Sequence, residues 1–439
     1  MKQHQKYNRV VIVGAGFGGL QAAQSLAHKA VEVILIDRHN YHSFIPLLYQ
    51  VVTAQLAPEQ VAVPIRNLLR KSPNISFLPG EVRAIDFAAK IVQLGEETLT
   101  YDYLVLATGS RSQFFGIDSA KHYAFPLKTL VQAVTLRNHL LSCFEQGERE
   151  LDFAQRQKLL TIAIVGGGAT GVELAGSLVE LVNDALHKDY PRLNSQDVTI
   201  ILVHSGDRLF AEFPASLGEY TVKKLRRLGV KVMLQSKVKT VSDQGFELDD
   251  GSYFSAATVI WAAGVTGAIP KSFPFPQTGN KGKIKVSPTL QLTAYPEVFA
   301  IGDLAHVDSD RQDLSGVAPE ALQQGVYVAK AIEKIIQGKP VAPFRYFNKG
   351  RLAIIGCYSG VGKIGGIKLR GFFPWLFWLA VHLVYFPNWR NRLMILMTWL
   401  HTYIIRDRAM RFILAVTSGN EQKYHQSQKS ARKNIALRH

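Results

Sequence analysis

The chain has 439 residues, enough for two or three domains, and its 47% apolar and 19% charged residues exclude an intrinsically disordered protein. Its two cysteines, Cys143 and Cys357, lie 214 residues apart and exclude a disulfide framework, a CxxC redox pair and a cysteine-based metal site. The net charge is +17, and residues 363–439 alone contribute +11, which indicates an anionic partner, either nucleic acid or acidic lipid.

The first predicted elements form a dinucleotide-binding unit. An apolar strand at 10–13 runs into a glycine-rich turn at 14–19, and after a helix a second apolar strand ends at Asp37. In such a unit the first glycine permits a tight turn, the second lets the backbone approach a pyrophosphate, and the third lets the helix pack closely on the strand. The acid accepts hydrogen bonds from a ribose diol. The glycines at these places are Gly14, Gly16 and Gly19.

The same pattern begins again with an apolar strand at 162–165, a second glycine-rich turn, a helix and a strand at 198–203. Here the acid is missing, because the strand ends in His204. Either His204 is a surface residue at a strand end, or this site tolerates or prefers NADPH, whose 2′-phosphate an acid would repel. The glycines of this turn are Gly166, Gly168 and Gly171.

Three later strands also end in glycine turns, which contain Thr108 and Gly109, then Gly264, and then Asp303. Strands that alternate with helices around two nucleotide-binding turns predict an α/β fold. We therefore expect two Rossmann-like, three-layer domains, followed by a C-terminal region of amphipathic helices.

Four stretches resemble one known family, the type II NADH dehydrogenases, which are single-subunit NAD(P)H:quinone oxidoreductases among the two-domain flavoprotein reductases. The stretches are His42–Tyr49, Gly166–Gly176, Ala318–Gly325 and the aromatic, arginine-flanked tail Gly371–Leu414. The resemblance implies FAD and NADH or NADPH as cofactors, and two-electron reduction of a membrane quinone without proton pumping. It implies a FAD-binding domain in two parts, 1–120 and 281–345, around an NAD(P)H-binding domain at 121–280, with a membrane-associating region at 346–439.

The resemblance also assigns the site residues. FAD is expected at Gly14, Gly16, Gly19, Asp37, Thr108, Gly109 and Asp303. NAD(P)H is expected at Gly166, Gly168, Gly171, His204 and Gly264. Glu173 and Gln323 are the predicted catalytic residues, with Glu173 where nicotinamide meets flavin, and Gln323 and Gln324 are expected at the quinone entrance. Pro319 departs from the family's glutamine at that motif position.

Several residues have plainer readings from the sequence alone. Glu173 could be a helix carboxylate favoured by the helix dipole, and Gln323 and Gln324 could lie on a helix surface. His42 reads as a core histidine rather than a proton carrier. An acidic cluster, Asp303, Asp308, Asp310 and Asp313, lacks the order of a calcium loop and reads as a polar surface loop, so no metal is expected.

The C-terminal aromatic region predicts contact with a membrane. Its apolar runs, 372–386 and 393–405, are shorter than the ~18–20 residues that span a bilayer. Tryptophan-rich faces flanked by arginines are typical of helices in the membrane interface, where each cation near acidic lipid contributes roughly 1 kcal/mol. Packing on a dimer partner is the alternative. The flanking arginines are Arg390, Arg392, Arg406, Arg408 and Arg411.

The partners expected are thus a membrane quinone, an acidic lipid surface and a second copy of the chain, but no nucleic acid, because the aromatics form apolar runs instead of alternating with the charges. The polar first nine residues lack a signal-peptide core, so we expect the cytoplasmic face of a membrane. Two other functions remain open. One is an NADPH-preferring reductase of a biosynthetic naphthoquinone, and the other is a FAD-binding redox sensor.

Overall fold

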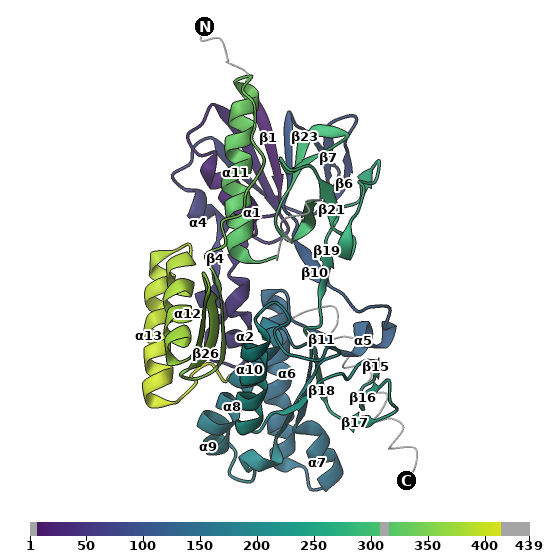
Figure 1. Cartoon of the computed structure of the whole chain (residues 1–439), viewed down its shortest axis with the longest axis vertical. Coiled ribbons are helices and arrows are strands. Elements are labelled where there is room, and N and C mark those ends of the chain that lie inside the picture. The colour runs from purple at the N-terminus through teal and green to yellow at the C-terminus, as the bar shows by residue number, and fades with distance from the viewer. Residues whose placement is uncertain (1–6, 308–315, 414–439) are drawn as a thin grey trace.

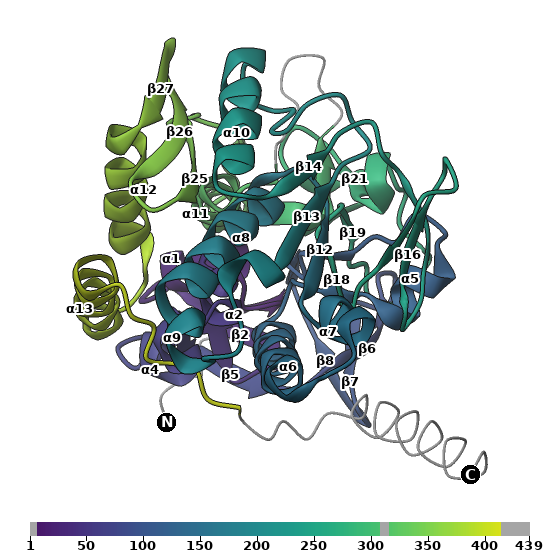
Figure 2. The same ribbon diagram turned by 90° about the horizontal axis from the view of Figure 1, so that it is seen from below.

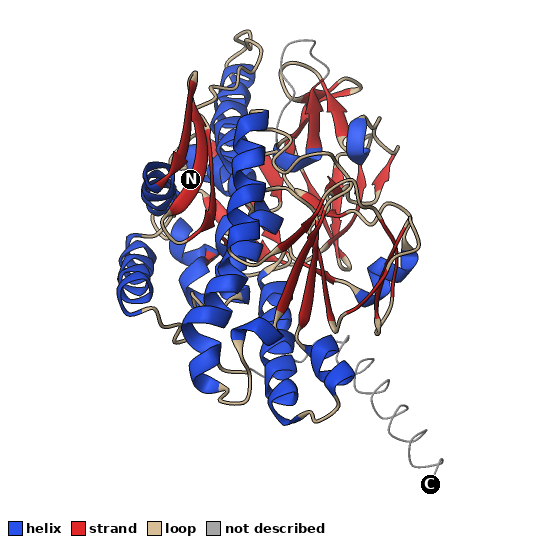
Figure 3. Ribbon diagram, turned by 60° about the horizontal axis from the view of Figure 1, so that its bottom comes forward, coloured by secondary structure: helices blue, strands red, loops and turns tan. Residues whose placement is uncertain are grey.

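The structure is a computed structural model that describes residues 7–307 and 316–413. Asp308, Asp310 and Asp313 of the acidic cluster, and the basic residues after 413, lie outside the described residues. Figure 1 shows two α/β units, one above the other, with a C-terminal layer of strands and helices along one side. In Figure 3 helices flank the strands of both units, and the predicted fold class is confirmed.

The first sheet has the strand order β22-β23-β9-β1-β2-β5. All neighbouring strands run parallel except β22 and β23. Helices α1 (Phe17–Ser25) and α11 (Ala318–Ile336) lie side by side against this sheet, and together they bury its apolar strands. The strands are β1 (Asn8–Val13), β2 (Val31–Asp37), β5 (Ile75–Pro79), β9 (Tyr103–Leu106), β22 (Gln291–Leu292) and β23 (Tyr295–Ala300).

The second sheet has the order β11-β18-β12-β13-β14, with every pair parallel. Its strands are β11 (Phe125–Pro126), β12 (Thr161–Val165), β13 (Thr199–Val203), β14 (Lys231–Met233) and β18 (Thr258–Trp261). The main helices are α6 (Leu130–Arg149), α8 (Ala169–Glu180) and α10 (Ala215–Arg227). The parallel strands are apolar on both faces because helices and a small antiparallel sheet cover them.

The two units are joined where β10 (Ser110–Ser112) pairs with β19 (Val265–Gly267). The chain then reaches β6 (Val82–Asp86) of the first unit through β20 (Ser272–Phe273), ahead of the boundary expected at residue 280. Shorter elements complete the units: β3 (Tyr41–Ser43), α2 (Leu48–Val52), α3 (Pro58–Val61), β4 (Ala62–Pro64), α4 (Ile65–Leu69), β7 (Ile91–Leu94), β8 (Glu97–Thr100), α5 (Asp118–Tyr123), α7 (Phe153–Leu159), α9 (His187–Asp189), β15 (Val238–Val241), β16 (Gly245–Leu248), β17 (Tyr253–Ser255), β21 (Ile284–Val286) and β24 (Ala305–Val307).

The C-terminal region contains an antiparallel sheet that the sequence did not predict, followed by the two expected helices. The sheet comprises β25 (Arg351–Gly356), β26 (Ser359–Ile364) and β27 (Ile367–Gly371), and the helices are α12 (Phe372–Tyr385) and α13 (Trp389–Ile405). Helix α8 of the second unit packs directly on β25, where a side chain at Gly176 would overlap the carbonyl of Ile355. Figure 2 shows α12 and α13 together at one edge of the molecule.

The tryptophans of this region correct the expectation of a tryptophan-rich membrane face. Trp375, Trp378 and Trp399 are at most 5% exposed and belong to the core that α12 and α13 share with the second unit. Trp389 is 75% exposed. The outer face of the two helices is instead made of other apolar side chains, among them Phe373, Val384, Leu393, Met397 and Ile404. No helix among the described residues is both long and apolar enough to cross a bilayer.

Two of the expected lipid-facing arginines also point inward. Arg408 is 1% exposed and donates to the carbonyl of Thr53 and to Oε2 of Glu180, each at 2.8 Å. Arg411 forms ion pairs with Asp189 and Asp407. Charge-assisted hydrogen bonds hold both guanidinium groups against partners in the protein, so these two arginines fasten the end of the described chain to the second unit instead of meeting lipid head groups.

Candidate active site

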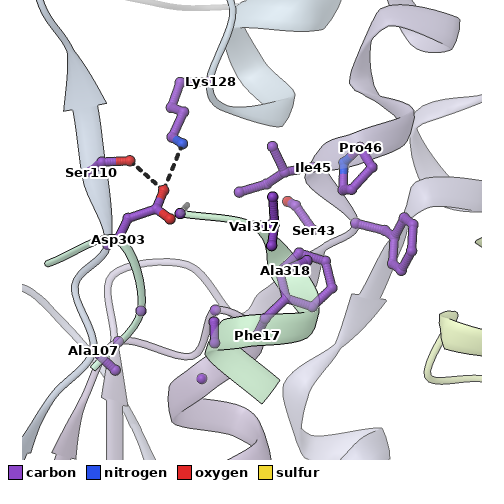
Figure 4. A pocket seen from close by; sticks show the side chains of 18 of the residues that line it. Phe17, Ser43, Ile45, Pro46, Ala107, Ser110, Lys128, Asp303, Val317 and Ala318 are labelled. Carbon is purple, nitrogen blue, oxygen red and sulfur yellow. Dashed lines mark hydrogen bonds and ion pairs between the residues drawn. The ribbon is translucent and has the colours of Figure 1, made fainter. Parts of the chain in front are cut away.

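A large cavity lies between the two units and extends to helix α12. Its volume is about 1400 Å³, more than the ~300–1,000 Å³ of a usual small-molecule pocket. The first glycine turn, the start of α8 and the inner side of α12 all contribute to its walls. Figure 4 shows polar Asp303 and Lys128 on one side and apolar Phe17, Ile45 and Pro46 on the other. The space therefore suits a long ligand with both polar and apolar parts.

The first glycine turn has the geometry that a pyrophosphate requires. Gly14 has φ +103°, a conformation that favours glycine, and a side chain at Gly19 would overlap the carbonyl oxygen of Gly14. Nothing lies within 4 Å of the place where a Cβ at Gly16 would stand, so the backbone there is open to the cavity. The N–H groups at the start of α1 face an anion bound in this position. The turn fits the dinucleotide FAD.

Asp37 lines the same cavity at the carboxyl end of β2. Its Oδ2 accepts from the Ala15 N–H at 2.7 Å, and its Oδ1 accepts from the His39 N–H at 2.8 Å. Burial opposes ionisation, but the hydrogen bonds from His39 and Ala15 outweigh it and hold the pKa of Asp37 below its ordinary value. An ionised carboxylate here is ready to accept the hydroxyls of a ribose.

The other residues expected at FAD also reach the cavity. Thr108 donates from Oγ1 to the carbonyl of Ala268 at 2.7 Å, and Gly109 follows with φ +71°. Asp303 accepts at Oδ2 from the Ser110 hydroxyl at 2.6 Å and lies 3.1 Å from Nζ of Lys128, as Figure 4 shows. Ser110 and Lys128 were not predicted, because nothing in the sequence signals contacts across 193 and 175 residues.

Glu173 enters the cavity from helix α8 and is 7% exposed. Its Oε1 accepts two hydrogen bonds, from the indole N–H of Trp378 at 3.1 Å and from the backbone N–H of Ile354 at 3.4 Å. Burial raises the pKa of Glu173 to about 8, although both hydrogen bonds act in the other direction. The group is thus a carboxylic acid at neutral pH, and its second oxygen is left to carry the proton.

His382 completes this wall of the cavity one helical turn after Trp378. The two rings stack with centroids 3.7 Å apart, and Nδ1 of His382 donates to the backbone carbonyl of Trp378 at 2.7 Å. Since Nδ1 carries the hydrogen, Nε2 of the neutral ring is an acceptor. Burial lowers the pKa of His382 to about 4, so the ring is neutral at physiological pH.

The second glycine turn repeats the geometry of the first. Gly166 has φ +125°, a side chain at Gly171 would overlap Gly166, and the position of a Cβ at Gly168 is open. His204 accepts at Nδ1 from the Gly167 N–H at 3.2 Å. Ala169 and Thr170, between the second and third glycines of this turn, line the cavity, whereas its glycines, His204 and Gly264 lie outside the lining.

Sequence comparisons identify the family. The profile of the pyridine nucleotide-disulphide oxidoreductases matches residues 8–325, and that of the NDH2 C-terminal domain matches residues 348–407. The chain is 36% identical over 421 residues to the type II NADH:quinone oxidoreductase Ndh of Mycobacterium tuberculosis, which covers 92% of this chain and 90% of that protein. The chain belongs to the type II NADH:quinone oxidoreductase family. This confirms the resemblance found in the sequence.

Further proteins are similar to this chain in sequence or in fold. The enzyme of Staphylococcus aureus is 29% identical, over 84% of this chain and 92% of its own length. Among solved structures, NDH2 of Plasmodium falciparum in complex with NADH superposes with a TM-score of 0.85 at 21% identity, over 93% of this chain and all of that one. The sulfide:quinone oxidoreductase of Aquifex aeolicus shares the fold with a TM-score of 0.70 at 18% identity, over 91% of this chain and 96% of that one.

The structure of this family member does not bring Gln323 or Gln324 into the cavity. Gln323 exchanges two hydrogen bonds with the backbone of Phe347, at 3.0 and 2.9 Å. Gln324 is fully buried, donating to Glu320 and accepting from the Gly302 N–H, so it braces the turn that carries Asp303. The members of this motif that line the cavity are Ala318, Pro319, Ala321 and Leu322. Contact of either glutamine with quinone stays a prediction.

His42 lies in the core beside the first glycine turn. His42 is 3% exposed and hydrogen-bonds through Nδ1 to the carbonyl of Ala15, and burial lowers its pKa. It therefore supports the first glycine turn from within the core, as expected. Across residues 7–307 and 316–413 no group of three or more histidine, cysteine, aspartate or glutamate side chains could hold a metal ion.

Proposed function

We propose that this protein uses bound FAD to oxidise NADH and to reduce a quinone drawn from a membrane. The observation that carries the proposal is the single cavity that joins three features. These are the turn that fits FAD, the start of α8 with Glu173, and the inner side of α12. FAD, when bound, accepts a hydride from nicotinamide and passes two electrons to a second substrate. The protein orients the reactants and excludes water from their contact.

Glu173 is the proposed proton donor for the quinone. Reduction of a quinone to a quinol takes up two electrons and two protons. Because Oε1 already accepts from Trp378 and Ile354, the acidic proton belongs on Oε2. Because its pKa is raised, Glu173 keeps this proton at neutral pH and can donate it to the quinone when the quinone is reduced. A hydride carries one proton together with its two electrons, so NADH supplies one of the two protons and the buried acid supplies the other, after which water reprotonates the acid.

The outer face of α12 and α13 is the proposed site of membrane attachment. Exposed apolar side chains run along both helices, and the inner side of α12 lines the cavity through Val381, His382 and Tyr385. A quinone leaving the bilayer beside α12 would therefore have a short path to Glu173. The exposed Arg390 and the net positive charge of the sequence after residue 413 favour a surface of acidic lipids. Attachment from the cytoplasmic face and assembly as a homodimer stay predictions.

Anaerobic spectroscopy of the purified protein tests the proposed function. The protein should be yellow and release FAD on denaturation. Addition of NADH should bleach the flavin absorbance, and addition of a soluble quinone should restore it. A colourless protein that takes up no FAD would overturn the proposal. Bleaching by NADH without recovery in any quinone would instead favour a redox sensor.

A further inference from the structure

The two glycine turns make the same contact with different partners. In the first unit the N–H of Ala15 donates to the Asp37 carboxylate at 2.7 Å. In the second unit the N–H of Gly167, the residue at the same place in its turn, donates to Nδ1 of His204 at 3.2 Å. His204 therefore occupies the position of the ribose-binding acid and is part of the nucleotide turn.

The second turn is also shaped for a ring at this position. A Cβ at Gly167 would lie 2.7 Å from Cγ of His204, closer than real Cβ atoms approach other atoms. The first unit has a Cβ at the corresponding place, on Ala15, beside the smaller carboxylate of Asp37. Gly167 thus provides the space that the imidazole needs together with the side chain of Leu209, whose Cδ2 lies 2.6 Å from the same Cβ position.

The hydrogen bond fixes the chemistry of the ring. A backbone N–H can only donate, so Nδ1 of His204 accepts and the neutral ring carries its hydrogen on Nε2. Burial lowers the pKa of His204, although Arg208, Asp207 and Glu212 act in the other direction, so the ring is neutral. A carboxylate at this place would present a negative charge and only acceptors. The imidazole presents no charge, and its one N–H donor is already used by the backbone carbonyl of Arg208.

The neighbouring side chains add further donors. Ser205 and Arg208 are exposed beside His204, and Arg208 makes one hydrogen bond, from Nη2 to the carbonyl of Ala211 at 3.2 Å. The acids that act on His204 are Asp207 and Glu212, and Glu212 lines the cavity instead of the strand end. A 2′-phosphate is an anion that needs donors and is repelled by a carboxylate at the acid position, which His204 occupies here. The exposed Asp207 lies three residues further along the same loop, next to Arg208. We propose that the second nucleotide site accepts NADPH as well as NADH, with His204 as the residue that permits it.

The inference rests on the proposed function, but one assay can distinguish the failure of either. The FAD-loaded, full-length protein is assayed with NADH and with NADPH against one water-soluble quinone. We expect kcat/KM for NADPH within tenfold of that for NADH. His204→Glu should lower the ratio of kcat/KM for NADPH to that for NADH at least tenfold, because a carboxylate repels the 2′-phosphate and accepts from the ribose hydroxyls of NADH. The control His122→Glu, at an exposed histidine of α5 outside the cavity, should leave the ratio unchanged.

Two results would overturn the inference. One is a preference of the unaltered protein for NADH beyond tenfold, which would mean that another group discriminates against the 2′-phosphate. The other is a nucleotide ratio that His204→Glu leaves unchanged. Binding of each nucleotide to the oxidised protein, measured by flavin fluorescence, keeps the test valid if the variant turns over slowly. Failure with both nucleotides would count against the proposed function instead.

Discussion

The indole N–H of Trp378 donates to Oε1 of Glu173 at 3.1 Å, although 205 residues separate the two in sequence. Glu173 belongs to the nucleotide-binding helix α8, and Trp378 belongs to α12, whose opposite side carries exposed apolar residues. One hydrogen bond thus links the acid in the cavity to the helix that we place at the membrane. The position of α12 therefore affects the pKa of Glu173.

Glu173→Gln should slow quinone reduction by about 10²- to 10⁴-fold, the usual contribution of a general acid. The amide keeps the shape and can still accept from Trp378, so reduction of the flavin by NADH should survive. The pKa of about 8 means that Glu173 is protonated below this value and loses its proton above it. Quinone reduction by the unaltered protein should therefore fall as the pH rises through about 8.

Stopped-flow measurement of the two half-reactions across this pH range checks the prediction. The Gln variant should show no decline near pH 8. If the unaltered protein and the Glu173→Gln variant showed equal rates in both half-reactions, Glu173 would have only a structural role.

Trp378→Phe should shift the same decline to higher pH. The indole N–H stabilises the charged form of Glu173, so its loss raises the pKa of the acid further. Trp399→Phe is a matched control. That indole is also buried and donates, but to Oε1 of Gln50 at 2.8 Å. The pH profile of flavin reoxidation should move in the first variant only, and similar profiles in both would show that general loosening of the core is responsible.

Arg408→Ala should destabilise the protein by ~3–5 kcal/mol, because it leaves Glu180 without its charged partner in a largely buried site. The two side chains are 1% and 18% exposed. Arg411→Ala, which breaks better-exposed pairs with Asp189 and Asp407, should cost ~1 kcal/mol or less. Urea unfolding of the FAD-loaded protein measures both. A smaller loss at Arg408 than at Arg411 would contradict the structural role given to the buried pair.

Val384→Glu and Ile404→Glu should each weaken binding to vesicles about tenfold, since each removes an apolar side chain worth ~1.5–3 kcal/mol when buried. These residues are 66% and 76% exposed on α12 and α13. Leu151→Glu is the control, at a residue 91% exposed on the far end of the second unit. Sedimentation with vesicles of phosphatidylcholine and phosphatidylglycerol provides the measurement. Weakening by Leu151→Glu alone would place the attachment elsewhere.

Point variants serve here better than removal of the chain from Gly371 onward. Such a truncation would also delete Trp378 and the buried Trp375 and Trp399, and would open the core beside α8. Lost activity would then say nothing about the membrane.

The glycine turns and Asp37 could be predicted because their functions depend on neighbours within one βαβ unit. Gly14, Gly19 and Asp37 all have the local geometry that their spacing indicates. The partners of Glu173 and Asp303 could not be predicted in the same way. Trp378 and Lys128 reach them from distant segments, and nothing in the local pattern marks them.

The C-terminal helices show why composition misled the prediction of their faces. Helix α12 is apolar on nearly all sides, so its periodicity cannot tell an inward from an outward residue. Trp378 and Trp399 can fill the inner side because their indole N–H groups donate to the buried acceptors Glu173 and Gln50. Arg408 likewise looks like a lipid-facing cation until the position of Glu180 is known.

The strand order of the first sheet has a consequence for synthesis on the ribosome. Strand β9 lies between β1 and β23, and β23 is made only after the whole second unit. Until then the nascent chain holds β9 as an open edge, which exposes unpaired backbone groups to other chains. The second sheet needs only strands between residues 125 and 261, so it can close earlier. The unit that is translated first is thus completed last, and the β9 edge stays open to pairing with other chains during that interval.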